Sequence, residues 1–253
     1  MSATEKVMGV LEEVCRSGGP YRLGDISSGS GVGKSSTHRI LKELVEANFV
    51  MTEGPGSYSV GPRMTALASG ALDETQRKAT LSSVLVDLQQ AVQHTVHFAM
   101  RSGTEAVYVQ KIESAHPFQM VSRVGMQIPL HCTAIGKCIL AWMSDDDLDA
   151  YLVGVHLERR TANTLIEPEA LRAELRKIRE QGFSIDDMEN ESTTRCVGAP
   201  VFDANGDVIG GVSVSVIIFL LSTEGLTILA PLVIEAGRQL SRILASPRPS
   251  GSW

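Results

Sequence analysis

The sequence predicts an α+β protein in two parts: a small helical part that ends in a hairpin, and a larger part built on antiparallel strands. Three observations support this prediction. The chain has 253 residues, a length that suggests two modest domains. Helical periodicity dominates residues 1–48 and then gives way to two short strand patterns separated by a Gly/Pro turn. Beyond residue 79, strand and helix patterns follow one another as far as residue 245.

The composition is typical of a soluble globular protein. Hydrophobic residues make up 43% of the chain and charged residues 21%, which allows a sizeable core. The first residues contain no apolar stretch of the signal-peptide kind. The longest apolar run, residues 208–221, is too short to cross a bilayer and is better interpreted as a buried strand. We therefore expect a cytoplasmic protein without a membrane segment.

Charge and cysteine content leave the function open. The net charge is −6, and the excess acid lies in residues 71–253, because residues 1–70 hold seven basic and seven acidic side chains. An acidic body can still carry a local basic surface for nucleic acid. The cysteines are scattered without a Cys-x-x-Cys pair, as expected of reduced thiols in the cytoplasm. They are Cys15, Cys132, Cys138 and Cys196.

Three helices are predicted before residue 48. Apolar residues from Val7 to Val14 recur at helical spacing, and this helix would stop at the Gly-Gly-Pro of residues 18–20. A short second helix over residues 23–28 is followed by a glycine-containing turn. The third helix begins near Lys34 and is closed by Asn48. Its predicted buried face has the spacing i, i+3, i+4, i+7 and i+8. That face consists of Thr37, Ile40, Leu41, Leu44 and Val45.

The opposite face of the third helix carries small hydroxyls and cations, with no acid before Glu43. Strand patterns over residues 49–52 and 58–60 follow it directly. Three helices followed by a hairpin is the order of a winged helix-turn-helix. Such a helix suits the major groove of DNA, and its N-terminus favours phosphate. We therefore predict a DNA-binding unit. Its candidate contacts are Lys34, Ser35, Ser36, His38, Arg39 and Lys42.

Two other interpretations of this part are weaker. The cationic face could simply be solvated, as most charged helix faces are, but the hairpin placed directly after the helix favours DNA. Residues 29–35 resemble a phosphate-binding P-loop. That motif needs a glycine where Ser28 stands and a buried strand before it, whereas residues 23–28 have a helical pattern.

Residues 31–41, Gly-Val-Gly-Lys-Ser-Ser-Thr-His-Arg-Ile-Leu, resemble the recognition segment of the IclR (isocitrate lyase regulator) family of transcription factors. Gly33 stands where that family usually has proline, which loosens the start of the helix. Residues 129–137 resemble the family's entry to its ligand-domain helix, and residues 182–203 resemble its third signature, with Thr193 where glycine is common. The resemblance covers nearly the whole chain, in the expected order.

This resemblance implies a winged helix-turn-helix domain over residues 1–63, a linker helix over 64–78 and an effector-binding domain over 79–245. The effector-binding domain would have a PAS/GAF-like antiparallel sheet flanked by helices. The resemblance also implies a homodimer or a dimer of dimers that binds operator double-stranded DNA. The tail, residues 246–253, is expected to be disordered.

Residue patterns in the larger part agree with this implied domain. Strand patterns flank turn sequences at residues 102–104 and 203–207. These strands are 95–100, 106–112, 196–202 and 208–216. Three helical patterns accompany them, one with Pro168 in its first turn and Gly182 just past its end. These helices are 134–143, 168–181 and 223–245.

A small carboxylate needs hydrogen-bond donors in a partly dry pocket, and free N–H groups at a helix N-terminus supply them without a buried cation. The resemblance implies that this effector site consists of the backbone of Ala134 and Ile135 with the side chains of Asp186, Cys196, Ser213 and Ser215. The alternation of Ser213 and Ser215 with valines independently puts both hydroxyls on one face of their strand. Without the resemblance, bonds to neighbouring backbone or water would be the better explanation of these hydroxyls.

No cofactor or metal is predicted. His131, Cys132, Asp186 and Cys196 lack any short ligand spacing. The main rival is an enzyme that uses Asp186, Asp187 or Glu189 with His131 for acid–base chemistry, although acid clusters in a turn are more often solvated. A second rival is a ligand sensor that has lost DNA contact, which Arg39 and the hairpin oppose. The sequence predicts a DNA-binding regulator controlled by a small organic acid. Repression and activation are not distinguished.

Overall fold

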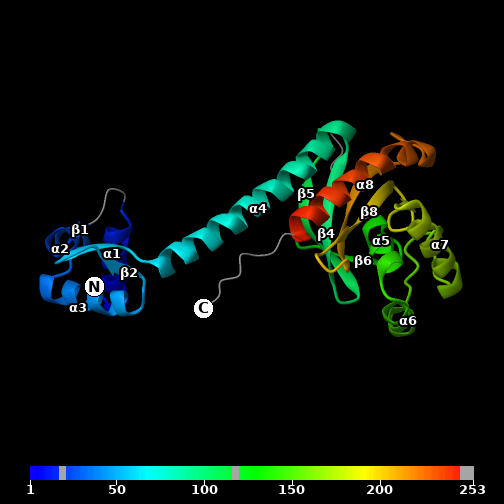
Figure 1. Ribbon diagram of the computed structural model, residues 1–253. Helices are drawn as coiled ribbons and strands as arrows, with labels where there is room; N and C mark the ends of the chain where they lie inside the picture. Colours follow the sequence, from blue (N-terminus) through cyan, green and yellow to red (C-terminus); the bar gives the residue numbers. More distant parts are fainter. Residues whose placement is uncertain (17–20, 116–119, 246–253) are drawn as a thin grey trace. The chain divides into compact units, whose positions relative to one another are not determined.

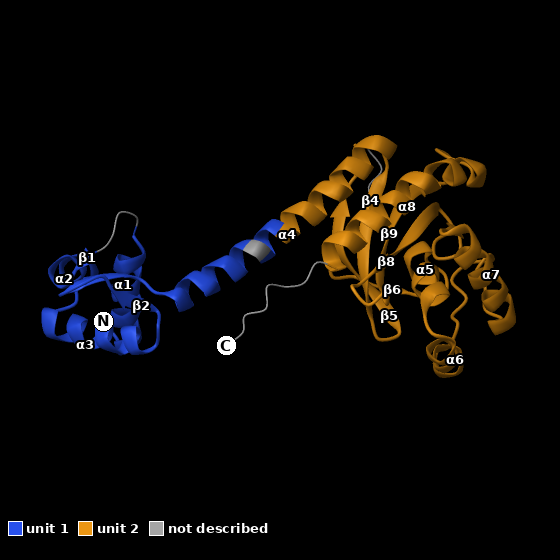
Figure 2. Cartoon of the chain, in the orientation of Figure 1, with its two compact units in different colours: residues 1–76, 249–253 blue, residues 77–248 orange. Residues whose placement is uncertain are grey.

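The computed structural model of the chain describes residues 1–16, 21–115 and 120–245. It divides into two compact units, with the boundary between Gln76 and Arg77 (Figure 2). The predicted end of the first helix at residues 18–20 and the predicted tail at 246–253 lie outside the described residues.

The N-terminal unit contains, in its described part, the three predicted helices: α1 (Ala3–Cys15), α2 (Leu23–Ser30) and α3 (Lys34–Glu46). Ser2 caps α1 by accepting a hydrogen bond from the backbone of Glu5. The predicted end of α3 is confirmed, because Asn48 has φ of 59°, in the left-handed region that asparagine tolerates.

A small antiparallel sheet completes this unit. The predicted hairpin is confirmed as β2 (Val50–Thr52) and β3 (Ser57–Val60). β3 also pairs with β1 (Tyr21–Arg22), a two-residue strand too short to leave any periodicity in the sequence. The core takes apolar residues from every helix and from the hairpin. Its most buried members include Val10, Ile26, Leu41 and Val50. This core fixes α3 against the unit by one face only.

Helix α4 (Pro62–Val92) passes from one unit into the other without a break. The expected linker helix over residues 64–78 is the first part of this longer helix, and the polar residues 73–78 do not end it. Four of these residues, Glu74, Gln76, Arg77 and Lys78, are good helix formers, and no glycine or proline interrupts the run. A polar run on an exposed helix has no apolar face to bury, so it changes the hydrophobic pattern without ending the helix.

The C-terminal unit is built, within the described residues, on a six-stranded antiparallel sheet (Figure 1). The strand order is β6-β5-β4-β9-β8-β7. The predicted strands are confirmed as β4 (Thr95–Ser102), β5 (Glu105–Ile112), β8 (Thr194–Phe202) and β9 (Val208–Ile217). The edge strands β6 (Gln127–Pro129) and β7 (Ser184–Asp187) are not predicted from the sequence.

Helices cover both faces of this sheet. The C-terminal half of α4 and the long α8 (Thr223–Ala245) pack on one face with the valines of β8 and β9. α5 (Ala134–Trp142) packs on the other face, and α7 (Pro168–Gln181) packs against α5. α6 (Asp145–Gly154) is a helix that the sequence analysis misses, capped by Ser144. The apolar run at 208–221 is mostly the central strand β9, as predicted. Among the described helices, none is long and apolar enough to cross a membrane.

Candidate DNA-reading helix and candidate effector pocket

The turn that leads into α3 is held by two hydroxyl groups, those of the half-buried Ser27 and the buried Thr37. Gly31 takes φ of 65°, a left-handed conformation that closes α2. The carbonyl of Val32 then accepts hydrogen bonds from Ser27 Oγ at 2.7 Å and from Thr37 Oγ1 at 3.0 Å. Thr37 is fully buried. The start of α3 is therefore fixed relative to α2, as a helix that must enter a groove requires.

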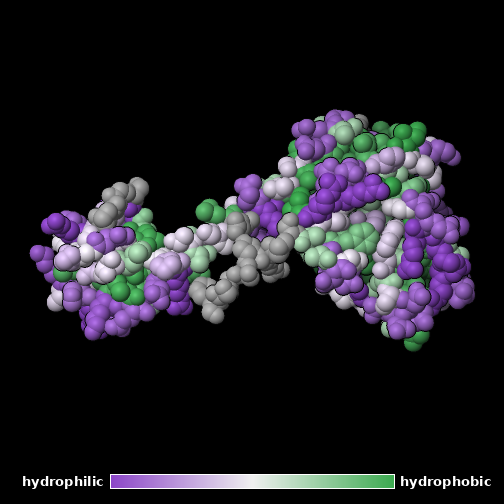
Figure 3. All heavy atoms as spheres, in the orientation of Figure 1, coloured by the Kyte–Doolittle hydropathy of each residue, from purple (hydrophilic) through white to green (hydrophobic). Residues whose placement is uncertain are grey.

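The side chains of α3 divide as predicted, with one difference. Thr37, Ile40, Leu41 and Leu44 are buried, whereas Val45 is only half-buried. Five of the predicted DNA contacts are exposed and Ser36 is half-exposed. The exposed contacts are Lys34, Ser35, His38, Arg39 and Lys42. Figure 3 shows hydrophilic residues over this face of the N-terminal unit.

The net positive charge on α3 is concentrated toward its N-terminal half. Its first turn contains no acid, and Gly33 at the N-cap provides no side chain to occupy the first N–H groups. The Arg39 side chain is 75% exposed, and its Nη1 lies 3.7 Å from Oε1 of Glu43, one helical turn further along the same face. Such exposed pairs contribute at most about 1 kcal/mol, so the guanidinium remains available to a stronger acceptor. The P-loop-like residues 29–35 span the end of α2, a turn and the start of α3, which is not the strand–loop–helix context of a P-loop.

In the C-terminal unit, two cross-strand rows gather the candidate effector residues on the α5 side of the sheet. One row aligns Asp186, Cys196 and Ser215 on β7, β8 and β9. The adjacent row aligns Gly198 with Ser213. Side chains of one row share a face of the sheet. Strands that are far apart in the sequence therefore bring these four candidate residues and Gly198 together.

The N-terminus of α5 is pressed against the second of these rows. A Cβ atom at Gly198 would lie 3.0 Å from the carbonyl carbon of Ala134, so a larger residue there would require α5 to move by a few tenths of an ångström. Ser184 Oγ donates to the carbonyl of Ala134 at 2.5 Å. Thr133 caps the helix by accepting from Gly136 N at 3.0 Å. The N–H groups of Ala134 and Ile135 belong to the first turn and have no intrahelical partner.

Asp186 is buried and already holds a turn in place. Its Oδ1 accepts from the backbone N–H groups of Glu189 at 2.7 Å and Asn190 at 3.3 Å. Within this turn Met188 has φ of 58°. Burial, aided by the nearby charge of Glu189, raises the pKa of Asp186 to about 7. The carboxyl group is thus poised between its acid and its carboxylate near neutral pH.

A buried ion pair lies behind this turn. The side chain of Lys137 on α5 is 1% exposed and contacts Glu189 Oε1, while Glu174 Oε1 of α7 lies 3.7 Å from the same ammonium. In the described part of the chain, no donor reaches Glu189 Oε2, although it is buried. Burial also raises the pKa of Glu189. The pair ties the 186–190 turn to α5.

A pocket of about 30 Å³ opens over the row of Cys196 and Ser215. Both ring nitrogens of His97, on β4, make polar contacts in this pocket. Nδ1 lies 3.2 Å from Ser215 Oγ, and Nε2 lies 2.7 Å from Ser122 Oγ. Cys196 Sγ lies 3.1 Å from Ser215 Oγ. Burial lowers the pKa of His97 to about 3, so the ring is neutral. Since one water needs about 10–15 Å³, the pocket as folded holds water-sized molecules.

Sequence reasoning misses several residues of this pocket. Of the six candidates, Cys196 and Ser215 line it, whereas the others lie in or against the two rows without lining it. His97 is the main omission, because the sequence analysis does not consider it as an effector residue. Its alternation with Val96 and Phe98 is a usable signal, since it places an imidazole on the same face as the serines. The other missed lining residues are Tyr108, Val121, Ser122, Asn190, Glu191 and Thr194, whereas Met120, which the sequence offers as a pocket-wall or core residue, does line the pocket.

The residues of the proposed acid–base rival have separate structural roles. His131 Nε2 lies 3.0 Å from the carbonyl oxygen of Glu158. Asp187 accepts from Arg195 Nε at 2.5 Å on the neighbouring strand. Asp186 is engaged by backbone N–H groups, as described above. Among the residues that the structure describes, no group of three His, Cys, Asp or Glu side chains could hold a metal ion.

Comparison with known proteins decides the family. Residues 3–54 match the model of the IclR helix-turn-helix domain, and residues 70–242 match that of the bacterial transcriptional regulator IclR C-terminal domain. The chain belongs to the IclR family of transcription regulators. It is similar to two Escherichia coli (strain K12) regulators. It is 32% identical to KdgR over 244 residues, which cover 95% of the chain and 92% of KdgR. It is 30% identical to XynR over 249 residues, which cover 98% of both chains.

Solved structures of this family share the fold. The crystal structure of the Thermotoga maritima IclR superposes with a TM-score of 0.65 at 31% identity, covering 96% of this chain and 98% of that one. An IclR homolog from Microbacterium hydrocarbonoxydans, complexed with 4-hydroxybenzoate, has a TM-score of 0.61 at 21% identity, covering 97% and 100%. The matched families and the curated relatives are transcription regulators, so the chain is a DNA-binding IclR-type regulator and not an enzyme.

Proposed function

We propose that this IclR-family regulator reads its operator with the N-terminal half of α3 and that a small organic acid controls its operator affinity. The observation that carries the first part is the exposed cationic face of α3, on a helix whose start is locked by Thr37 and Ser27. Arg39 reads a base edge, and Lys34, Ser35, Ser36, His38 and Lys42 contact phosphates.

Two copies act together in this proposal, as a homodimer or a dimer of dimers. A dimer places two α3 helices in successive major grooves and matches a palindromic operator. One bidentate contact between arginine and guanine contributes about 1–3 kcal/mol of discrimination. Use of Arg39 in both copies therefore counts twice in the free energy of specific binding.

The operator is first obtained by selecting duplexes from a random library with the purified chain, and Arg39→Ala is then titrated with the selected DNA. We expect a loss of about tenfold or more in affinity, with relaxed sequence preference, because the base contact is removed. Arg238→Ala is the matched control, since this side chain is 70% exposed on α8, outside the DNA-binding unit. Full affinity and unchanged preference in Arg39→Ala would exclude Arg39 as the reading residue.

The effector site in this proposal is the face formed by the two cross-strand rows and the start of α5. The donors that meet a carboxylate there are the N–H groups of Ala134 and Ile135 and the hydroxyls of Ser213 and Ser215. They are joined by Asp186 in its acid form and by the thiol of Cys196. Because the pocket holds about 30 Å³ as folded, an acid with a carbon skeleton must displace lining side chains, among them Ser122, which contacts His97. This rearrangement is how the effector alters the DNA-binding state.

A thermal-shift screen of small carboxylates, 4-hydroxybenzoate among them, identifies a ligand, since binding to the folded state raises its apparent stability. Ser215→Ala and Asp186→Ala are then titrated with that ligand in the presence of selected operator. We expect a weakened effector response and nearly unchanged DNA binding without ligand. Ser83→Ala, at an exposed position on α4, is the control. If both site variants respond like the parent chain, the effector site lies elsewhere.

A further inference from the structure

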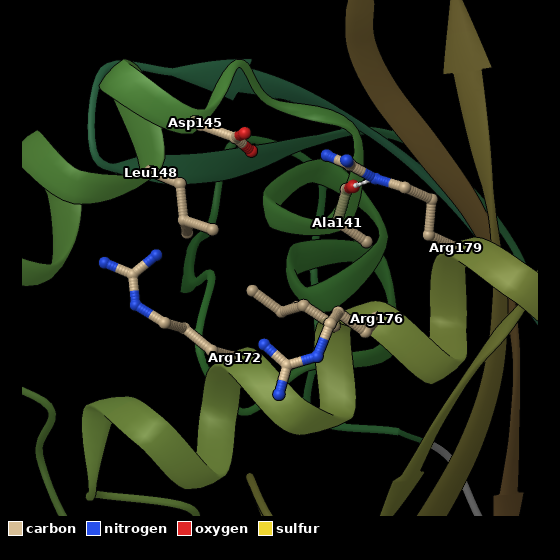
Figure 4. A pocket seen from close by; sticks show the side chains of 7 residues that line it. Ala141, Asp145, Leu148, Arg172, Arg176 and Arg179 are labelled. Carbon is tan, nitrogen blue, oxygen red and sulfur yellow. Dashed lines mark hydrogen bonds between the residues drawn. The ribbon is translucent and has the colours of Figure 1, made fainter.

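A second and larger cavity lies away from the two cross-strand rows, between the end of α5, the start of α6 and one face of α7 (Figure 4). Its volume is about 350 Å³, within the range of about 300–1,000 Å³ typical of small-molecule sites. Its walls combine arginines with apolar side chains and one acid. The lining residues are Ala141, Asp145, Leu148, Arg172, Leu175, Arg176 and Arg179.

The three arginines project from a single face of α7, at the spacing i, i+4 and i+7. The outer two are anchored. Arg179 donates to the carbonyls of Ala141 at 2.5 Å and Met143 at 3.1 Å, which are the last acceptors of α5. Arg172 pairs with Asp149 of α6, and Oε1 of Glu169 lies 3.7 Å from its Nε. Anchored guanidinium groups are pre-organised, and each keeps N–H donors that these contacts do not use.

The middle arginine of the row has no such anchor. In the described part of the chain, Arg176 makes no hydrogen bond and no ion pair. Its exposed charge therefore has no counter-ion among the described residues, and its position on α7 lies between those of Arg172 and Arg179. Asp145 is the acid that lines the cavity, so the lining carries three positive charges against one negative charge. Three guanidinium groups that line one cavity favour an anion as its occupant.

The rest of the wall is apolar. Leu148 and Leu175 are buried side chains of α6 and α7 that reach the cavity, and Ala141 closes it at the end of α5. Leu148 and Leu175 are only 7% and 4% exposed, so the hydrocarbon part of an organic anion would contact them over a small area beside the arginines.

From the arginine row and the apolar wall, we propose that this cavity is a second ligand site for a small organic anion, distinct from the effector pocket. The acidic group lies against Arg176 and the free N–H groups of Arg172 and Arg179, and the hydrocarbon part contacts Leu148 and Leu175. Bidentate pairing between guanidinium and carboxylate supplies orientation as well as affinity. Asp145 on the facing wall favours ligands that also carry a hydroxyl group.

Benzoate is the first probe, because it joins one carboxylate to an apolar ring, and benzamide is its neutral counterpart of the same shape. Binding to the full chain is measured by titration calorimetry. We expect saturable benzoate binding with Kd below about 1 mM and at least tenfold weaker binding of benzamide. Inorganic phosphate should compete poorly. Benzoate and benzamide binding equally, or the absence of saturable benzoate binding, would overturn the proposal.

Two variants locate the site. Arg176→Gln should weaken benzoate binding about ten- to a hundredfold, because a charge-assisted contact is lost. Lys177→Gln is the matched control, since its side chain is 71% exposed on the same helix and does not line the cavity. Benzoate bound in the effector pocket would be unaffected by Arg176→Gln, so unchanged binding in this variant rejects the second site and leaves the proposed effector site untouched. A crystal soaked with 4-bromobenzoate should place the bromine beside Leu148 and Leu175.

Discussion

Replacing Lys137 with methionine removes the charge that faces Glu189 and keeps a side chain of similar length. The site allows little relaxation, because the side chains of Lys137 and Glu189 are 1% and 9% exposed. After the substitution, the carboxylate of Glu189 would remain buried, with Oε2 already lacking a donor in the described structure. Glu174, at 3.7 Å from the ammonium, is 27% exposed and can turn toward water. The substitution therefore removes the electrostatic stabilisation of Glu189 more than that of Glu174.

Breaking a buried pair in this way costs about 3–5 kcal/mol, since one charge is left uncompensated. A domain of this size is stable by about 5–15 kcal/mol, so the C-terminal unit should remain folded but much weakened. Replacing both partners, as in Lys137→Met with Glu189→Met, should recover most of the loss, because the desolvation of both charges is removed as well.

The measurement is urea denaturation followed by tryptophan fluorescence in a Trp253→Phe background. Trp142, on α5 beside Phe202 with ring centroids 6.0 Å apart, then reports on the C-terminal unit alone. Lys177→Met is the control, at an exposed position on α7. The deficit of Lys137→Met should shrink from pH 8 to pH 5, because an unpaired buried Glu189 has a raised pKa and takes up a proton in the folded state. A loss under about 1 kcal/mol, equal to that of Lys177→Met, would refute a stabilising role for the buried pair.

Three further predictions concern single positions. Gly136→Ala should destabilise the C-terminal unit by about 2 kcal/mol or more, as measured by its urea midpoint, because the new Cβ would lie 2.3 Å from the Cα of Leu130. Burial raises the pKa of Asp186 to about 7, so the folded state is most stable relative to the unfolded state below the unfolded pKa, and this stability is lost as the pH rises from about 4 to 7. The unfolding free energy of Asp186→Asn minus that of the parent chain should therefore increase across this window. A difference that stays constant with pH would contradict the raised pKa. Asn48→Ala should lower the unfolding free energy of the N-terminal unit by about 1 kcal/mol, as measured by thermal denaturation, because the left-handed φ of 59° is less favourable for alanine than for asparagine. Asn48→Gly should cost less, because glycine adopts this conformation readily.

The DNA-binding unit could be predicted almost completely from the sequence. Its evidence is local, since the spacing from Thr37 to Leu44 identifies both the helix and its buried face, and Asn48 marks its end. The two-residue strand β1 is missed because its existence depends on pairing with β3 and not on its own residues.

The effector face could be predicted only in part, because it depends on register between distant strands. The alternation of Ser213 and Ser215 with valines places both hydroxyls on one face from local sequence alone. The approach of His97 to Ser215 requires the pairing of β4 with β9, more than a hundred residues later in the chain. Strand β7 is four residues long and acidic at its end, so a turn was the simpler interpretation of Asp186 and Asp187.

The nine residues of α5 are attached at both ends to groups outside the helix. At the first turn, Ser184 holds the carbonyl of Ala134, and at the last turn Arg179 holds the carbonyls of Ala141 and Met143. A helix of this length spans about 13 Å and is too short to curve appreciably. A displacement of α5 along its axis must therefore move both ends together, and a change at Arg179 that shifts the helix in this way should be felt by the amides of Ala134 and Ile135.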